Sequence, residues 1–234
     1  MKTKLFSIVI ILALLAPLAI AQNSDKSKIS FAILGGINFQ NINGKDNNGN
    51  KLKNGLLTGF HAGVNINIPV APDFYFQPGL LFSIKGAKDD FFSPQSKASG
   101  NFETTTKLSY IEMPLNLLYR PQLGKGYILL GFGPYIAFGI GGKEKSVIGP
   151  IIYERDVKFK NTVTNFIDLI DNAYYRPFDA GANIFFGYEL SMGVLLQLNA
   201  QLGLLKINPE YSWTTDSKAS YKNTGFGISI GYRF

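Results

Sequence analysis

The sequence predicts an all-β fold, an eight-stranded antiparallel up-and-down transmembrane β-barrel with short periplasmic turns and long extracellular loops. Three observations predict it. The composition is apolar and glycine-rich, with 46% hydrophobic residues, 25 glycines and only 17% charged residues. Eight segments alternate apolar and polar side chains, and the connections between them alternate short and long. Beyond residue 21 no apolar run reaches the ~20 residues of a membrane-spanning helix, so membrane crossing is expected through strands.

The first 21 residues have the pattern of a secretory signal peptide. Lys2 and Lys4 precede an apolar stretch, and Ala19 and Ala21 supply the small residues of a cleavage site. We therefore expect export by the Sec pathway, with the mature chain starting at Gln22. The expected organisation is a cleaved signal peptide (1–21), a short periplasmic segment (22–28) and the barrel (29–234).

The alternation has a period of two residues, because successive side chains of a strand point to opposite faces. Ile37 and Asn38 illustrate it. A soluble β-barrel has the same period with the faces reversed, so the composition of the polar face decides. That face is rich in Gly, Asn, Gln and Ser and suits a narrow lumen, whereas the apolar faces contain no Asp, Glu, Lys, Arg, Asn or Gln. The segments are 29–39, 60–68, 74–85, 111–120, 127–141, 178–189, 194–204 and 226–234.

The connections give the orientation, since outer-membrane barrels have short periplasmic turns and longer outer loops. Both termini are then periplasmic. Within the longest loop, apolar residues at roughly helical spacing over 162–172 predict a short amphipathic helix or a folded cap, with a flexible loop as the alternative. The short connections are 71–73, 121–126 and 191–193, and the long ones are 41–54, 87–104, 142–175 and 208–221.

Three prolines, Pro78, Pro114 and Pro134, fall inside predicted strands. A proline has no N–H for the ladder. We expect a β-bulge at or beside each.

The residue types in the sequence give little support for catalysis or metal binding. The single histidine, His61, is expected to fill the lumen as a hydrogen-bonded residue, with an Asp–His catalytic pair as the alternative. The chain has no cysteine, and Asp89-Asp90 lacks the spacing of a calcium loop. Gly139-Ile140-Gly141-Gly142 is not followed by the residues of a phosphate loop. We expect no catalytic residue, cofactor or metal.

Six charged residues fall on inward faces, three acids and three bases. Because an eight-stranded barrel is only wide enough for side chains to fill, they predict a salt-bridge network inside the lumen. A proton- or ion-conducting path is the alternative. The six are Lys85, Glu112, Arg120, Asp179, Glu189 and Arg233.

The chain ends in Tyr232-Arg233-Phe234, with both aromatic residues on the predicted lipid face. This terminus is similar to the C-terminal assembly signal that the outer-membrane insertion machinery recognises, although Ser229 stands where a glycine is usual. The formal charge of +7 includes Lys2 and Lys4 of the predicted signal peptide, and other lysines are scattered through the loops. They predict solvated charge or contact with anionic lipid headgroups rather than a nucleic-acid site.

Four short motifs together resemble the PorT-like outer-membrane β-barrel family of Bacteroidota. The resemblance implies an outer-membrane barrel with prolines inside its strands, and for the family's namesake a link to type IX secretion. The expected function is non-enzymatic, in a structural, surface-binding or secretion- or uptake-accessory role, with lipid, the insertion machinery and a protein at the long loops as partners. A small channel and an enzyme that uses His61 are the alternatives. The motifs are Tyr110-Ile111-Glu112-Met113-Pro114-Leu115, Gly133-Pro134-Tyr135, Phe178-Asp179-Ala180-Gly181 and Gly231-Tyr232-Arg233-Phe234.

Overall fold

The computed structural model describes residues 28–89, 102–214 and 217–234, most of them in β-strands. None of the helical segments in this part of the chain has the length and apolarity of a transmembrane helix. The predicted signal peptide, with Ala19 and Ala21, lies outside the described residues, as do Asp90 and nearly all of the 22–28 segment.

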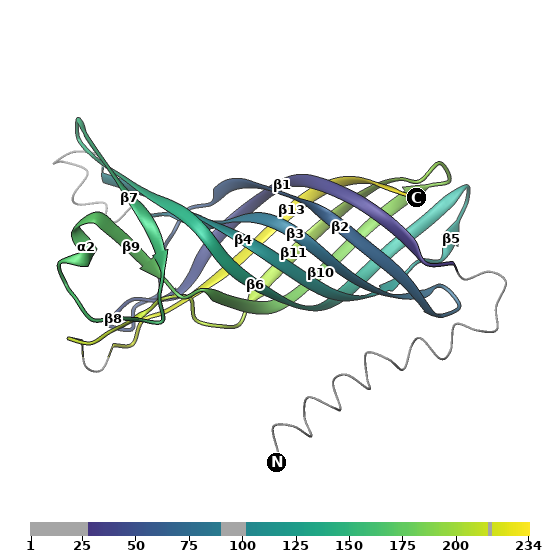
Figure 1. Cartoon of the computed structure of the whole chain (residues 1–234). Helices are drawn as coiled ribbons and strands as arrows, with labels where there is room; N and C mark the ends of the chain where they lie inside the picture. The colour runs from purple at the N-terminus through teal and green to yellow at the C-terminus, as the bar shows by residue number, and fades with distance from the viewer. Residues whose placement is uncertain (1–27, 90–101, 215–216) are drawn as a thin grey trace, which may run out of the picture.

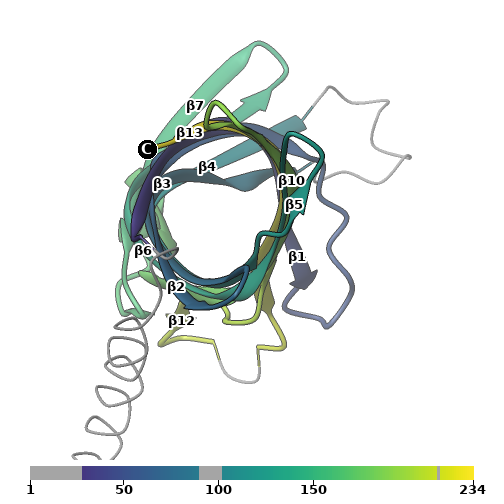
Figure 2. The same ribbon diagram turned by 90° about the vertical axis from the view of Figure 1, so that its right-hand side faces the viewer.

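Eight long strands form a closed ring (Figures 1 and 2). Each is antiparallel to both neighbours, and the pairings of β1 with β13 and of β6 with β10 complete the closure. The prediction of an eight-stranded antiparallel barrel is confirmed. In ring order the strands are β1 (Ser30–Lys45), β2 (Leu57–Ala71), β3 (Phe74–Asp89), β4 (Phe102–Tyr119), β6 (Gly126–Ile148), β10 (Phe178–Leu190), β11 (Val194–Gly203) and β13 (Ser220–Arg233).

Burial in this barrel is the reverse of burial in a soluble protein. Ile37 is 55% exposed while Asn38 beside it is 3% exposed, and Leu198 is 56% exposed while Gln197 is 9% exposed. The apolar side chains thus form an outer belt suited to lipid, and the amides point into the lumen. The inward and outward faces agree with the alternation in the sequence.

The two ends of the barrel differ as the loop lengths predict. At the right-hand end in Figure 1, short turns join the strands, and one of them contains the small strand β5 (Gln122–Leu123). Asp73 and Gly193 adopt positive φ of 62° and 90° in two of these turns. The described parts of the long connections lie at the other end, which is the extracellular end of an outer-membrane barrel.

The longest connection forms a folded cap (Figure 1). Strand β6 continues beyond the ring and pairs with β7 (Ile151–Phe159), and β9 (Asn172–Tyr175) adds to β7 in parallel. Strand β8 (Thr162–Val163) pairs with β12 (Glu210–Tyr211) of the last loop. The predicted helix over 162–172 is wrong except for α2 (Asp168–Asp171), because residues on both sides of it find strand partners elsewhere in the cap.

The expected bulges at the three prolines are also wrong. Pro78 is paired with Leu115 on β4 but has no paired residue on β2. The register of β2 with β3 is the same on both sides of this gap. Pro114 and Pro134 behave in the same way, each paired on one side and unpaired on the other. In an antiparallel strand each residue directs its N–H to one neighbour only, so a proline interrupts one ladder and leaves the other intact.

The two register shifts lie elsewhere, between Pro69 and Ala71 and between Ser109 and Tyr110. The second is opposite Gly139 and Gly141 at the point where β4 and β6 leave the membrane belt for the cap. A bulge increases local twist, and beyond the ring β6 continues into the hairpin with β7 (Figure 1).

Candidate functional site

The lumen contains a buried cluster of one base and two acids, Lys85, Glu112 and Asp179, which we call the outer triad. Glu112 and Asp179 lie on either side of Ala137 in the register of β4, β6 and β10. The ammonium of Lys85 lies 2.8 Å from Glu112 and 3.1 Å from Asp179. The small side chain of Ala137 leaves room for this convergence, and all three charged residues are nearly completely buried.

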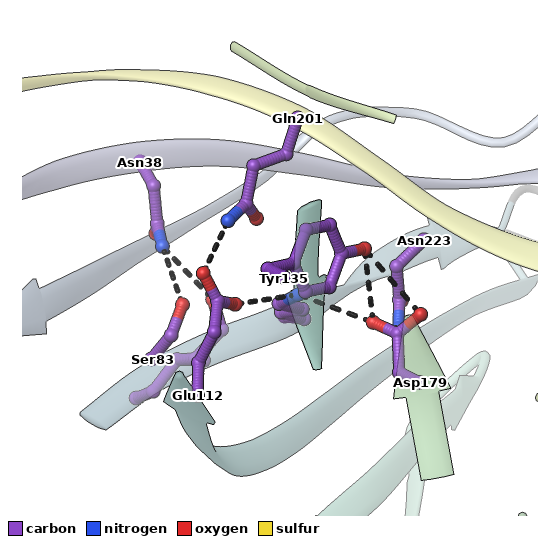
Figure 3. A network of polar contacts seen from close by, with 9 residues as sticks. Asn38, Ser83, Glu112, Tyr135, Asp179, Gln201 and Asn223 are labelled. Carbon is purple, nitrogen blue, oxygen red and sulfur yellow. Dashed lines mark hydrogen bonds and ion pairs between the residues drawn. The ribbon is translucent and has the colours of Figure 1, made fainter. Parts of the chain in front are cut away.

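Neutral side chains complete the hydrogen bonding of the outer triad (Figure 3). Asn223 donates to Asp179 at 3.0 Å, and the Tyr135 hydroxyl donates to the same carboxylate at 3.3 Å. Gln201 donates to Glu112. The Lys85 ammonium also lies 4.1 Å from the centre of the Tyr135 ring, within cation–π range. Because these groups come from six different strands, the network crosses the lumen.

A second charged cluster lies near the short turns, and we call Arg120, Glu189 and Arg233 the inner triad. Glu189 accepts from Arg120 at 2.6 Å and from Arg233 at 2.7 Å. The Arg120 guanidinium lies 3.5 Å from the centre of the Tyr127 ring. All six inward charges predicted from the sequence therefore face the lumen, where the structure divides them into two separate triads.

The triads carry opposite formal charge. The outer one has two acids and one base, and the inner one has two bases and one acid. We expected a single network with balanced charge. The six charges do balance in total, but they are distributed unevenly between the two triads. An anion meets net negative charge at one end of the lumen and a cation meets net positive charge at the other.

Apolar layers accompany both triads, and the sequence argument for a lumen rich in Gly, Asn, Gln and Ser did not include them. Ala32, Leu118, Leu129, Phe185 and Leu195 form a buried cluster near the short turns. A second cluster, the apolar floor, lies under the extracellular mouth and includes Ile207 from the last loop. Its members are Ile42, Ala87, Leu108, Tyr110, Tyr135, Ala137, Val157, Ala173, Tyr175 and Ile207.

A polar cavity of about 70 Å³ occupies the middle of the barrel, lined mainly by asparagine and glutamine side chains. His61 faces it. The hydrogen-bond partner of the His61 ring in the described part of the chain is the Ser229 hydroxyl, at 2.7 Å, and not a carboxylate. The geometry is that of a lumen-filling residue.

Above the apolar floor the barrel opens into a cavity of about 940 Å³, which we call the vestibule. Its walls come from β4, β6 and β9 and from the loops that carry β8 and β12. Two ion pairs lie in its wall: Arg155 with Glu144, and Arg176 with Glu210 at 2.7 Å. Among the described residues, no group of acids and histidines is arranged to hold a metal ion.

Tyrosines form much of the apolar surface of the vestibule. Tyr174 and Tyr175 come from β9, and Tyr211 and Tyr221 come from the last loop and β13. Burial, together with nearby Glu144, raises the pKa of the Tyr175 hydroxyl above its usual range. The chain's one tryptophan, Trp213, is 41% exposed beside the vestibule.

The sequence argument did not identify these vestibule residues. A signal was present, since aromatic residues of the connections 142–175 and 208–221 gather at 174–175 and 211–213. Their convergence depends on the parallel pairing of β8 with β12, which joins the two loops.

The last two aromatic residues lie on the outer face at the short-turn end. Tyr232 is 40% exposed and Phe234 is 69% exposed, and their rings lie edge to face with centres 5.0 Å apart. They form the end of the lipid-facing row of β13.

Sequence comparison agrees with this architecture. The family described as outer membrane protein beta-barrel domain matches residues 20–208. The chain belongs to this family. As a member of the outer membrane protein beta-barrel domain family with a closed eight-stranded ring, it is a protein of the bacterial outer membrane. No curated protein sequence matches it.

Two solved structures of outer-membrane proteins match the chain over most of its length. One is the structure of Ail, the attachment invasion locus protein of Yersinia pestis, in complex with the heparin analogue sucrose octasulfate. The chain is 13% identical to Ail, the match covers 88% of this chain and 99% of Ail, and the TM-score is 0.38. It is 11% identical to Neisserial surface protein A, with 88% and 99% covered and a TM-score of 0.42.

Proposed function

We propose that this barrel is a non-conducting surface receptor that binds its ligand in the extracellular vestibule. The observation that carries the proposal is a vestibule of about 940 Å³ that lies directly above a layer of buried apolar side chains. This volume is within the range of small-molecule sites, ~300–1,000 Å³. A cavity that opens outward above a closed floor is suited to binding and not to passage.

Two features support the absence of conduction. The apolar floor contains Leu108, Tyr110 and Ile207, each 0% exposed, so hydrated ions have no polar path through it. The two triads then oppose ions of either sign, because their net charges differ in sign. A conducting barrel would need the apolar floor and the layer of charged triads to open together.

Planar-bilayer recording of the purified full chain tests this proposal. We expect no stepwise conductance beyond that of protein-free bilayers. The matched variant is Leu108→Ser with Ile207→Ser, which replaces two floor residues by small polar ones and is expected to admit a measurable current. Regular conductance steps from the wild-type protein would overturn the proposal.

A small channel is the second candidate. The observation that favours it is the central polar cavity lined by amide side chains and His61. It predicts conductance that changes when the triads are neutralised, for example by Glu189→Gln. The same recording separates this candidate from the receptor.

We propose no enzymatic activity. His61 bonds to a hydroxyl and, among the residues that the structure describes, has no carboxylate partner to orient it as a base. We expect His61→Ala to assemble into a barrel with an unchanged surface phenotype. A hydrolase or transferase activity that this substitution abolishes would contradict that expectation.

Membership of the PorT-like branch and an accessory role in secretion or uptake are further proposals, supported by the four sequence motifs and by the folded cap. We expect three kinds of partner: outer-membrane lipid, the insertion machinery and a protein at the cap. Co-purification from the native outer membrane tests the last. Recovery of secretion-system subunits with the barrel would favour the accessory role, and recovery of the barrel alone would count against it.

A further inference from the structure

We propose that the vestibule binds a neutral oligosaccharide. This inference rests on the proposed receptor function and names the chemical class of its ligand. It follows from three properties of the lining, namely its hydrogen-bonding groups, its charge balance and its aromatic rim.

Most of the polar groups in the lining can both donate and accept hydrogen bonds. The described residues that line the vestibule include four asparagines, four threonines and three serines. Amides and alcohols provide both functions within one side chain. A sugar hydroxyl also donates and accepts. Such a lining therefore complements a polyhydroxylated ligand better than it complements a ligand that only accepts, such as a phosphate or carboxylate.

The charges of the lining balance, and five of the six charged side chains, all but Lys206, are held by partners within the described part of the chain. Three acids and three bases are present among the described lining residues. Glu144 accepts from Arg155, and Glu210 accepts from Arg176. The Asp46 carboxylate accepts from the backbone N–H groups of Asn48 at 2.9 Å and Asn50 at 2.8 Å. An anionic ligand that used either guanidinium would have to displace a carboxylate from it, whereas a neutral ligand leaves both ion pairs intact.

A group of three aromatic side chains, of which Tyr211 lines the vestibule, lies at one side of it. Trp213 lies between Ser212 and Thr214, which both line the vestibule, and its ring centre is 5.2 Å from that of Tyr211. The Phe166 ring contacts Trp213 from the other side at 5.6 Å, edge to face. The pairing of β8 with β12 fixes this group. The apolar C–H face of a pyranose ring stacks on such exposed rings while its hydroxyls reach the amides.

The experiment is a glycan array with neutral and charged oligosaccharides, probed with the detergent-solubilised full chain. We expect retention on neutral glycans and little on sulfated or carboxylated ones. Trp213→Ala is expected to weaken retention by on the order of tenfold. Ile152→Ala is the matched control, because Ile152 is 60% exposed on the β6–β7 hairpin and, unlike Trp213, has no chain neighbour that lines the vestibule.

A second variant tests the charge balance without depending on the tryptophan. Glu210 is largely exposed, so Glu210→Gln leaves the fold intact and frees the Arg176 guanidinium. We expect this variant to gain retention on carboxylated and sulfated glycans relative to neutral ones. Retention on charged glycans alone by the wild type, or an unchanged pattern in both Trp213→Ala and Glu210→Gln, would overturn the proposal.

The two proposals fail in different ways. A barrel that shows no conductance yet retains no neutral glycan would overturn the ligand class and leave the receptor function standing. A barrel with regular conductance steps would overturn the receptor function itself.

Discussion

Lys85 on β3 and Asp179 on β10 form an ion pair of 3.1 Å, although two other strands separate β3 from β10 in the ring. The contact therefore spans the lumen instead of following the sheet. Glu112 joins it from β4 at 2.8 Å. These ion pairs connect strands that are not neighbours in the barrel wall. They fix the relative positions of those strands, as contacts in a packed core do.

Replacing Lys85 by methionine should destabilise the barrel strongly. Two buried carboxylates would remain without their cation, and breaking a buried ion pair in this way typically costs about 3–5 kcal/mol. Urea unfolding in detergent, followed by the fluorescence of the single tryptophan, measures the loss. The triple variant Lys85→Met with Glu112→Gln and Asp179→Asn should recover most of it. Equal stability of Lys85→Met and wild type would contradict this view.

A methyl group added at Gly131 should be costly, and one added at Gly141 should not. A Cβ at Gly131 would overlap the buried ring of Phe185, its cross-strand partner, whereas nothing lies within 4 Å of a Cβ at Gly141. We expect Gly131→Ala to lower the free energy of unfolding by about 1–3 kcal/mol. Urea unfolding of the two alanine variants compares them directly. Similar stability of the two would show that the Phe185 ring moves freely.

Tyr175 should resist ionisation at alkaline pH. Burial, and then the charge of Glu144, raise the pKa of its hydroxyl above the usual ~10. A raised pKa means that the folded state holds this proton more tightly than the unfolded state does. Its contribution to stability is present below about pH 10 and is lost as the pH rises toward the folded-state pKa.

Ultraviolet absorbance of tyrosinate measures this behaviour. The variant Tyr175→Phe should lack one late-titrating tyrosine out of the 12 in the chain and should lose less stability above about pH 10. An identical titration curve at high pH in the variant and the wild type would rule out the assignment.

Phe234→Ala should reduce assembly into the outer membrane without greatly changing the stability of barrels that do assemble. The reason is our proposal that Tyr232 and Phe234 form the signal for the insertion machinery. Phe226→Ala is the matched control, since Phe226 is 51% exposed on the same outward row of β13. The yield of folded, heat-modifiable protein in isolated membranes gives the comparison. An equal drop in both variants would indicate lost lipid contact and no signal.

Several features could be predicted without the structure. The two-residue period predicted which side chains face lipid, and the loop lengths predicted which end carries the cap. The side that each residue faces and the length of each connection can both be read along the chain, without knowing which distant segments meet. The prolines show the limit. Pro78, Pro114 and Pro134 indicated bulges, yet the register is unchanged across each of them, because each interrupts only one of the two ladders of its strand.

The cap shows the same limit for the candidate site. Apolar spacing over 162–172 indicated a helix, but β8 pairs with β12 and β9 pairs with β7. Those pairings bring Tyr175, Tyr211 and Trp213 to one cavity. Strand pairing between distant loops has no local signature, so the vestibule could not be predicted.

The sequence by itself determined the orientation of each strand residue, because alternation along a strand is a local geometric property. It therefore placed Lys85, Glu112 and Asp179 in the lumen. Only the tertiary structure decided that these three meet while Arg120, Glu189 and Arg233 form a separate group. The reason is that contacts across a lumen depend on the relative shift of all the strands around the closed ring, which aligns Glu112 and Asp179 on either side of Ala137.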